Sequence, residues 1–163
     1  MNGKEAIHAS ANFSDLVLKS YISDLDDDEL MTRPGEGCNH LAWQLGHLVA
    51  SEVHILNSVA PGKAIELPEG FSDAHSKETC ASDDAGDFAK KQDYIDLYEQ
   101  IRQATNAALN AATDTDLAAP APESFRSFCP TVADVYILMA SHPMMHAGQF
   151  AVARRKIGKP ILM

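Results

Sequence analysis

Two histidines lie four residues apart in the sequence SHPMMHAGQF, which spans residues 141–150. Steps of three and four residues place His142 and His146 on one helical seam, with apolar residues before them and Gln149 after them. A buried imidazole without a partner costs on the order of a few kcal/mol of desolvation, so such a pair needs something to bind. A metal ion is the commonest partner, because HxxxH on a helix directs two nitrogens to one place. Hydrogen bonds to water or to carboxylates at a bundle end are the alternative.

A metal site needs at least a third ligand, and an earlier segment offers three histidines spaced by sevens: His40, His47 and His54. Positions seven apart on a helix are separated by about 10.5 Å, so only one of the three can share an ion with the HxxxH pair. Spacing alone leaves open which one. Three neutral imidazoles leave a divalent ion its full charge and an open position, the arrangement of a catalytic zinc site. Such a site supports hydrolysis or the transfer of a thiol.

Two further polar residues are candidates for a supporting or substrate-binding role. Glu52 falls within the apolar arc of its segment, where it would orient a ligand histidine, act as a base, or pair with an arginine such as Arg102 or Arg126. Gln149 lies one turn beyond the HxxxH pair. It would hydrogen-bond a group on the metal, or else join two helices.

Four amphipathic segments must position these side chains. Apolar residues recur at helical spacing over residues 4–24, 40–59, 87–112 and 132–158. Asn39 is expected to cap the second segment and Thr131 the fourth. No segment of useful length alternates with period two, so we predict an all-α fold, a four-helix bundle. Pro143 either opens a separate helix, with Ser141 near its cap, or kinks the last helix beside the histidines.

A long connection separates the second and third predicted helices. It covers residues 61–87 and contains PEGF and the acidic sequence ETCASDDAGD. A connection of more than about 15 residues is usually functional or disordered. We expect a flexible flap over one end of the bundle, carrying a short helical turn. Residues 1–163 are otherwise expected to form one domain, since 45% hydrophobic residues supply a single core.

Composition excludes several classes of partner. A net charge of −10 disfavours nucleic acid, and the cationic RRK at residues 154–156 is expected to complement a helix dipole. The longest apolar run, VYILMA, is too short to span a bilayer, and the N-terminus lacks the apolar run of a signal peptide, so we expect a cytoplasmic protein with no membrane partner. Cys38, Cys80 and Cys129 form no CxxC pair and have no cationic neighbour in sequence, so they are expected to be reduced and not nucleophilic.

Two stretches resemble the DinB-like family of metal-binding four-helix bundles. HLAWQLGHLVASE contains the W-x-x-x-H-L element of that family, and HPMMHAGQFAVARRKIGKP contains its H-x-x-x-H-x-G-Q followed by R-R-x-x-G-K-P. The resemblance implies that His47, His142 and His146 bind one divalent ion, zinc or nickel. His40 and His54 would then have no role at the metal. The motif does not require Pro143.

The resemblance also implies a range of activities. The family includes thiol-dependent S-transferases, a thiol-dependent isomerase and many members with no assigned activity. We therefore expect a metal-dependent enzyme that acts on a small molecule by hydrolysis or by transfer involving a low-molecular-weight thiol. A homodimer is expected at the family level. The alternative is a non-catalytic helical bundle that binds a partner or a small ligand.

Overall fold

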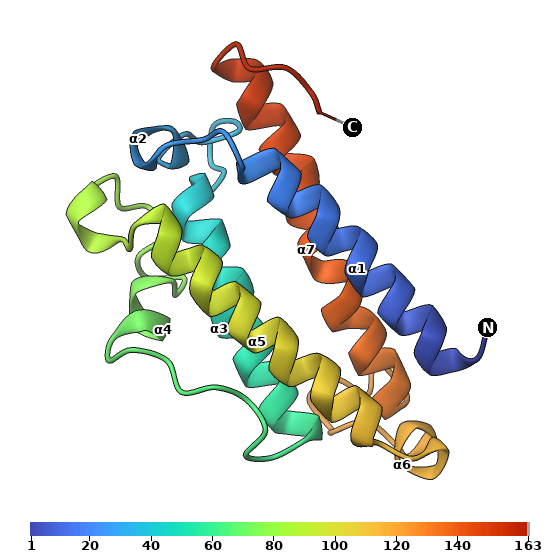
Figure 1. The fold of residues 1–163 in the computed structure, drawn as a ribbon. Helices are drawn as coiled ribbons and strands as arrows, with labels where there is room; N and C mark the ends of the chain where they lie inside the picture. The colour runs from blue at the N-terminus through green and yellow to red at the C-terminus, as the bar shows by residue number, and fades with distance from the viewer. Residues whose placement is uncertain (163) are drawn as a thin grey trace.

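The computed structural model describes residues 1–162, and all regular elements in that range are helical (Figure 1). Four long helices form a bundle, which confirms the predicted fold class. They are α1 (Gly3–Ile22), α3 (Leu41–Val59), α5 (Lys91–Ala111) and α7 (Val132–Lys156). Shorter elements join them: α2 (Asp27–Leu30), α4 (Phe71–Ala74), the 3-10 turn η1 (Ala85–Asp87) and α6 (Asp114–Ala118). The predicted helical segments differ from these bounds by a few residues at most.

Side chains at the helix N-termini fix where the helices begin. Thr131 caps α7 as predicted, because its side chain accepts from the Asp134 amide while the Asp134 carboxylate accepts from the Thr131 amide. The prediction that Asn39 caps α3 is wrong. His40 is the cap, and its Nδ1 accepts a hydrogen bond from the Trp43 amide at 3.0 Å.

The long helices run up, down, down and up. Arg154, late in α7, donates to the carbonyl of Tyr21 at the end of α1, so these two helices are parallel. Lys4, early in α1, donates to the carbonyl of Asn110 at the end of α5, so α5 runs the opposite way. α3 is also antiparallel to α7, since Gln44 near its start contacts Gln149 near the end of α7. Figure 1 shows this arrangement, with α1 and α5 in front of α7 and α3.

The long connection is a crossover along the side of the bundle, not a flap over one end as predicted. Because α3 and α5 run in the same direction, the chain must travel back about 28 Å, the length of a 19-residue helix, before α5 begins. The connection is anchored on the way, since Phe71, His75 and Phe88 are all buried. The predicted short helical turn is confirmed by α4 and η1.

His75 docks the connection onto α3 and α5. Its Nδ1 donates to the Phe71 carbonyl at 2.7 Å, and its Nε2 accepts from the Tyr94 hydroxyl at 2.8 Å. The ring lies directly on the backbone of α3, because a Cβ added at Gly46 would be 2.1 Å from the His75 ring. A glycine at position 46 is therefore required by this close approach.

Pro143 lies inside one continuous helix, so of the two alternatives considered for it, a separate helix opening at this residue is wrong. Ser141 is not a cap, because its hydroxyl donates back to the carbonyls of Ile137 and Leu138. Proline has no amide hydrogen, so the carbonyl four residues earlier, at Met139, loses its helical donor. Arg102 Nη1 donates to that carbonyl at 3.2 Å instead.

Arg154, near the end of α7, joins this helix to the end of α1. Arg154 is fully buried and donates to the Asp24 carboxylate and to the Pro160 carbonyl, so its role goes beyond the predicted complement to the helix dipole. Gly158, with φ of 75°, turns the chain, and Lys159 pairs with Glu29 at 2.8 Å. The R-R-x-x-G-K-P sequence therefore has a structural role, because Arg154 and Lys159 tie the end of the chain to the segment that follows α1.

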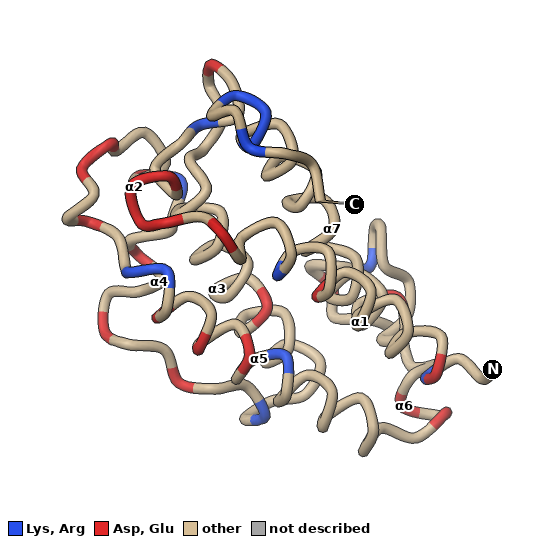
Figure 2. Tube along the Cα trace, turned by 45° about the horizontal axis from the view of Figure 1, so that its top comes forward, with Lys and Arg blue, Asp and Glu red and all other residues tan. Residues whose placement is uncertain are grey.

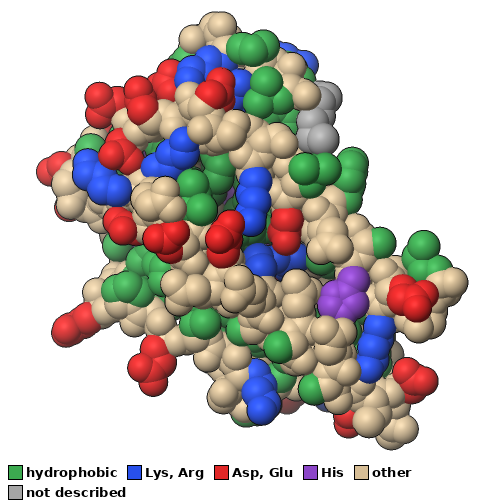
Figure 3. Space-filling model, viewed as in Figure 1, with side chains coloured by type: hydrophobic (Ala, Val, Ile, Leu, Met, Phe, Trp, Pro, Cys, Tyr) green, Lys and Arg blue, Asp and Glu red, His purple; other side chains and the backbone are tan. Residues whose placement is uncertain are grey.

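Charged side chains are spread over the surface. Acidic residues gather on α2 and the neighbouring turns (Figure 2), while the Lys and Arg side chains on the face seen in Figure 3 lie singly or in small groups among acidic ones. None of the helices within residues 1–162 combines the length and the apolar character needed to cross a membrane.

Candidate metal centre

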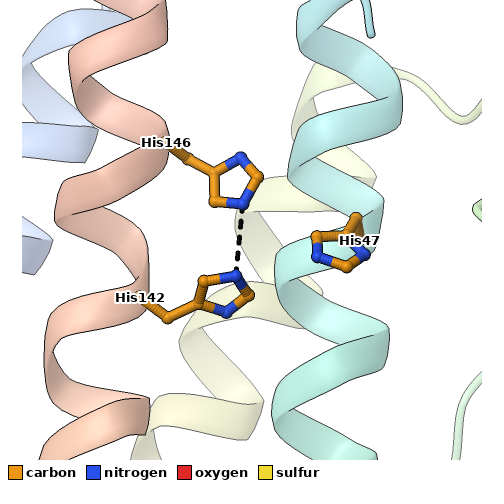
Figure 4. Close-up of side chains that lie close together, drawn as sticks. All are labelled: His47, His142 and His146. Carbon is orange, nitrogen blue, oxygen red and sulfur yellow. Dashed lines mark hydrogen bonds between the residues drawn. The ribbon is translucent and has the colours of Figure 1, made fainter.

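Three histidines converge between α3 and α7 (Figure 4). α3 contributes His47, and α7 contributes His142 and His146. One nitrogen of each ring lies within 4.8 Å of the other two. The Nε2 atoms of His142 and His146 are 3.2 Å apart, and the His47 ring centroid lies 5.4 Å from each of the other two centroids. These residues are called the histidine cluster.

The other two histidines of α3 lie away from this cluster. His40 is fully buried, caps the helix and packs edge-on against Phe88 at 4.4 Å between ring centroids. His54 is exposed and lies 6.5 Å from the Phe125 ring. A seven-residue spacing therefore brings only His47 to the pair on α7, as the helical rise requires.

All three imidazoles are held neutral by their surroundings. Burial, and then the neighbouring imidazoles, lower the pKa of His146 to about 3. Burial, and then His47, lower the pKa of His142 to about 4. Burial also lowers the pKa of His47. At neutral pH each ring therefore carries a lone pair that can bind a cation.

Gln44 fixes which nitrogen of His146 carries the proton. Gln44 Nε2 donates to the Asn39 backbone carbonyl at 2.8 Å, and because a carbonyl only accepts, this contact sets the orientation of the amide. Gln44 Oε1 then faces His146 Nδ1 at 2.9 Å, so Nδ1 is the protonated nitrogen. His146 Nε2 keeps its lone pair and faces His142 (Figure 4). The hydrogen bond between the two Nε2 atoms therefore uses a proton on His142.

Gln149 supports Gln44 and has no recorded contact with the histidines. Its Oε1 accepts from Gln44 Nε2 at 2.9 Å, so of the two roles considered for it, the bond between helices is the one present. Sequence reasoning missed Gln44 itself. The available signal was an amide on the buried face of α3, three residues before His47, where hydrocarbon would pack better.

His47 is positioned by stacking. The Trp43 ring lies parallel to it, with an interplanar angle of 9° and 4.9 Å between centroids. The Trp43 indole in turn donates to the Ser76 carbonyl at 3.0 Å, so the connection holds the tryptophan. Ser51 Oγ lies 3.3 Å from His47 Nδ1. His47 and His142 are half-buried, which leaves one side of the histidine cluster facing solvent.

Glu52 belongs to a second polar group, called the ionic cluster, made of Asp15, Glu52, Arg102 and Thr105. Arg102 Nη1 donates to both Glu52 oxygens at 3.0 and 3.1 Å, and Thr105 Oγ1 donates to Glu52 at 2.6 Å. Arg102 Nε pairs with Asp15 at 3.1 Å. Burial raises the pKa of Glu52, and Arg102 opposes that shift. Within residues 1–162 no recorded polar contact of this carboxylate goes to a histidine.

The arginine pairing expected for Glu52 is thus made by Arg102 and not by Arg126. Arg126 donates instead to the Ala121 carbonyl at 2.9 Å. Through Arg102, the ionic cluster also reaches the Met139 carbonyl that Pro143 leaves free. The four long helices therefore all contribute to, or contact, this one group.

The donor set fits a divalent metal ion. Two nitrogens on one tetrahedral zinc, each about 2.0–2.1 Å from the ion, lie about 3.3–3.4 Å apart. The 3.2 Å between His142 Nε2 and His146 Nε2 is close to that value. The hydrogen bond from His146 Nδ1 to Gln44 is the kind of outer contact that orients ligand histidines in metalloproteins.

The chain matches a model of a known protein family. A family model described as the DinB superfamily covers residues 17–150, which is more than half of the chain and includes all three histidines. No curated protein matches the chain.

Proposed function

Because the chain belongs to the DinB superfamily, we propose that it is a metal-dependent enzyme in which His47, His142 and His146 hold one divalent ion, zinc or nickel. The substrate would be a small molecule. The observation that carries the proposal is the state of His146: a backbone carbonyl orients Gln44, and Gln44 holds the proton of His146 on Nδ1. The Nε2 lone pair therefore points into the cluster, where it accepts from His142 in the metal-free protein.

A divalent ion bound there would lower the pKa of a water or a thiol and polarise a carbonyl group. The chain itself supplies the neutral donors, the fixed orientation of His146 and an open side between α3 and α7. Glu52, the carboxylate considered as a base, is already engaged by Arg102 and Thr105. A thiol, with a pKa of about 8.5, needs a much weaker base than water does. This favours thiol transfer over hydrolysis as the reaction.

Elemental analysis of untagged protein, purified without added metal, tests the metal site. The parent is expected to carry about one equivalent of one divalent ion, and His47→Ala and His146→Ala are expected to lose it. His54→Ala is the matched control, because His54 lies on the same helix outside the histidine cluster. A metal-free parent that gains no thermal stability from added zinc or nickel would overturn the proposal.

The non-catalytic alternative makes a different prediction. If the bundle only binds a partner, the metal-loaded protein shows no turnover with small thiols and electrophilic substrates, while removal of the ion leaves the fold intact. Turnover that is present in the parent and absent in His146→Ala at the same zinc concentration would exclude that alternative.

A further inference from the structure

The histidine cluster is oriented by two backbone carbonyls that lie outside the helices carrying it. The Asn39 carbonyl holds Gln44, which fixes His146, and the Ser76 carbonyl holds Trp43, which stacks on His47. Asn39 belongs to the loop before α3, whereas Ser76 belongs to the crossover connection. The position of each carbonyl therefore depends on how these two segments are held together.

Arg33 joins the two segments. Its Nη1 donates to the Cys38 carbonyl at 2.8 Å and to the Cys80 carbonyl at 3.0 Å, so one nitrogen bridges the loop and the connection. Its Nη2 donates to the Ser82 carbonyl at 2.9 Å, and its Nε donates to Asp83 at 2.8 Å. The guanidinium is thus a cationic neighbour of two cysteines that have none in the sequence, but it binds their backbone carbonyls and not their sulfurs.

We propose that Arg33 is a positioning residue for the histidine cluster: it clamps the loop before α3 to the crossover, so that the Asn39 and Ser76 carbonyls stay in place for Gln44 and Trp43. In its effect on metal binding, this inference rests on the proposed function. Arginine suits the task because its planar fork carries five donors in fixed directions, which lysine does not offer.

The ion pair with Asp83 contributes little to this clamp. The Asp83 side chain is 76% exposed, and exposed ion pairs are worth about 0–1 kcal/mol. The Arg33 side chain is only 23% exposed, and its bonds to three backbone carbonyls tie the segments together. Loss of Asp83 should therefore matter much less than loss of Arg33.

Metal affinity is the first measurement. Trp43 is the single tryptophan of the chain and stacks on His47, so its emission reports Ni²⁺ binding to the histidine cluster. We expect Arg33→Gln to bind Ni²⁺ tenfold to a hundredfold more weakly than the parent, the usual range when outer contacts of ligands are lost. Asp83→Asn should change the affinity less than twofold. Arg126→Gln, which removes an arginine from another loop carbonyl, should leave it unchanged.

Exchange of the Trp43 indole hydrogen with solvent is the second measurement, made on metal-free protein. With one tryptophan, the indole gives a single resonance in a ¹H–¹⁵N spectrum. We expect exchange at least tenfold faster in Arg33→Gln, because the Ser76 acceptor is no longer held, and unchanged exchange in Arg126→Gln.

Unchanged Ni²⁺ affinity together with unchanged indole exchange in Arg33→Gln would overturn the inference. A parent that binds neither Ni²⁺ nor Zn²⁺ would refute the proposed function alone, since the exchange measurement still decides whether the clamp holds Trp43. If Arg33→Gln fails to fold, Arg33→Lys keeps the charge and loses the fork. It is expected to show the faster exchange, and parental exchange in that variant would also overturn the inference.

Discussion

The ionic cluster and the histidine cluster both place polar groups inside an otherwise apolar bundle, yet they are built in opposite ways. In the ionic cluster opposite charges are paired: Glu52 accepts from Arg102 and Thr105, and Arg102 also pairs with Asp15. Arg102 Nη2 is its one buried atom without a partner. The histidine cluster is neutral and half open to solvent, and it brings one nitrogen of each ring within 4.8 Å of the other two. The charges of the first cluster are paired with one another, whereas the second cluster consists of neutral rings with one side open to solvent.

The largest expected effect comes from breaking the ionic cluster. Arg102→Met would leave Glu52 and Asp15 as buried or part-buried charges without their partner. We expect the free energy of unfolding to fall by about 3–5 kcal/mol, as found when one member of a buried pair is removed. Urea denaturation of the metal-free protein measures this. The double variant Glu52→Leu/Arg102→Met should recover much of the loss, because both charges of the pair are then gone. A loss below about 1 kcal/mol in Arg102→Met would mean that the ionic cluster does not hold the bundle together.

Substitutions in the histidine cluster should behave differently from those in the ionic cluster. They should change the free energy of unfolding little unless a metal is present. His47→Leu is expected to change the stability of the metal-free protein by less than about 1 kcal/mol, since a half-buried neutral ring is replaced by hydrocarbon. The parent should gain about 2.7 kcal/mol from zinc at 100 times its Kd, and the variant should gain none. Urea titrations with and without zinc test this, and His54→Leu should retain the full gain.

Gln44 provides a further test of the difference between the two clusters, because it is a neutral residue that should affect metal binding through His146. Gln44→Leu removes the acceptor of His146 Nδ1–H, and we expect the zinc affinity to fall tenfold to a hundredfold. Competition with a chromogenic chelator measures it. Gln149→Leu, which removes one bond to Gln44, should have a smaller effect. Equal zinc affinity in the parent and in Gln44→Leu would contradict the role of Gln44 in fixing the tautomer of His146.

The smallest effect on stability is expected at the ion pair between Asp24 and Arg154, which is more exposed than the ionic cluster. The hydrogen bond from Arg154, and then Coulombic attraction, outweigh the desolvation that opposes them and hold the pKa of Asp24 down at about 2. A carboxylate with a lowered pKa adds stability above its unfolded pKa of about 3.9, and this contribution is lost as pH falls towards 2. Because the Asp24 side chain is 46% exposed, the contribution should be below about 1 kcal/mol. Unfolding titrations of the parent and Asp24→Asn should converge between pH 5 and pH 2.5, and a constant gap would contradict the assignment.

The helices and the likeness to a metal-binding family could be read from the sequence, because period and motif are local properties. Thr131 is such a case: its cap depends only on Asp134, three residues on. The sequence does not decide the cap of α3, because Asn39 and His40 are adjacent and both side chains are able to accept; the structure shows that His40 Nδ1 accepts from the Trp43 amide. Local patterns carry no such information.

Contacts between distant segments could not be predicted in the same way. The course of the crossover follows from the relative directions of α3 and α5, which periodicity does not report. Glu52 had two plausible arginine partners in sequence, and only the packed structure selects Arg102. The contacts of Arg33 could not be predicted from the sequence, because its partners are backbone carbonyls, which every residue has.

The parallel pairing of α1 with α7 also orders events during synthesis. Of the long helices, α1 leaves the ribosome first and α7 last. The packing of α1 against α7 can therefore form only after all the other long helices have been synthesised. The same last helix carries His142, His146, Gln149 and the Met139 carbonyl that accepts from Arg102. A nascent chain lacking α7 therefore exposes the apolar face that α1 packs against α7, whereas Glu52 already has its partners Arg102 and Thr105 on α5. Release of the final helix buries this apolar face, gives Arg102 its acceptor at the Met139 carbonyl and brings His142 and His146 to His47.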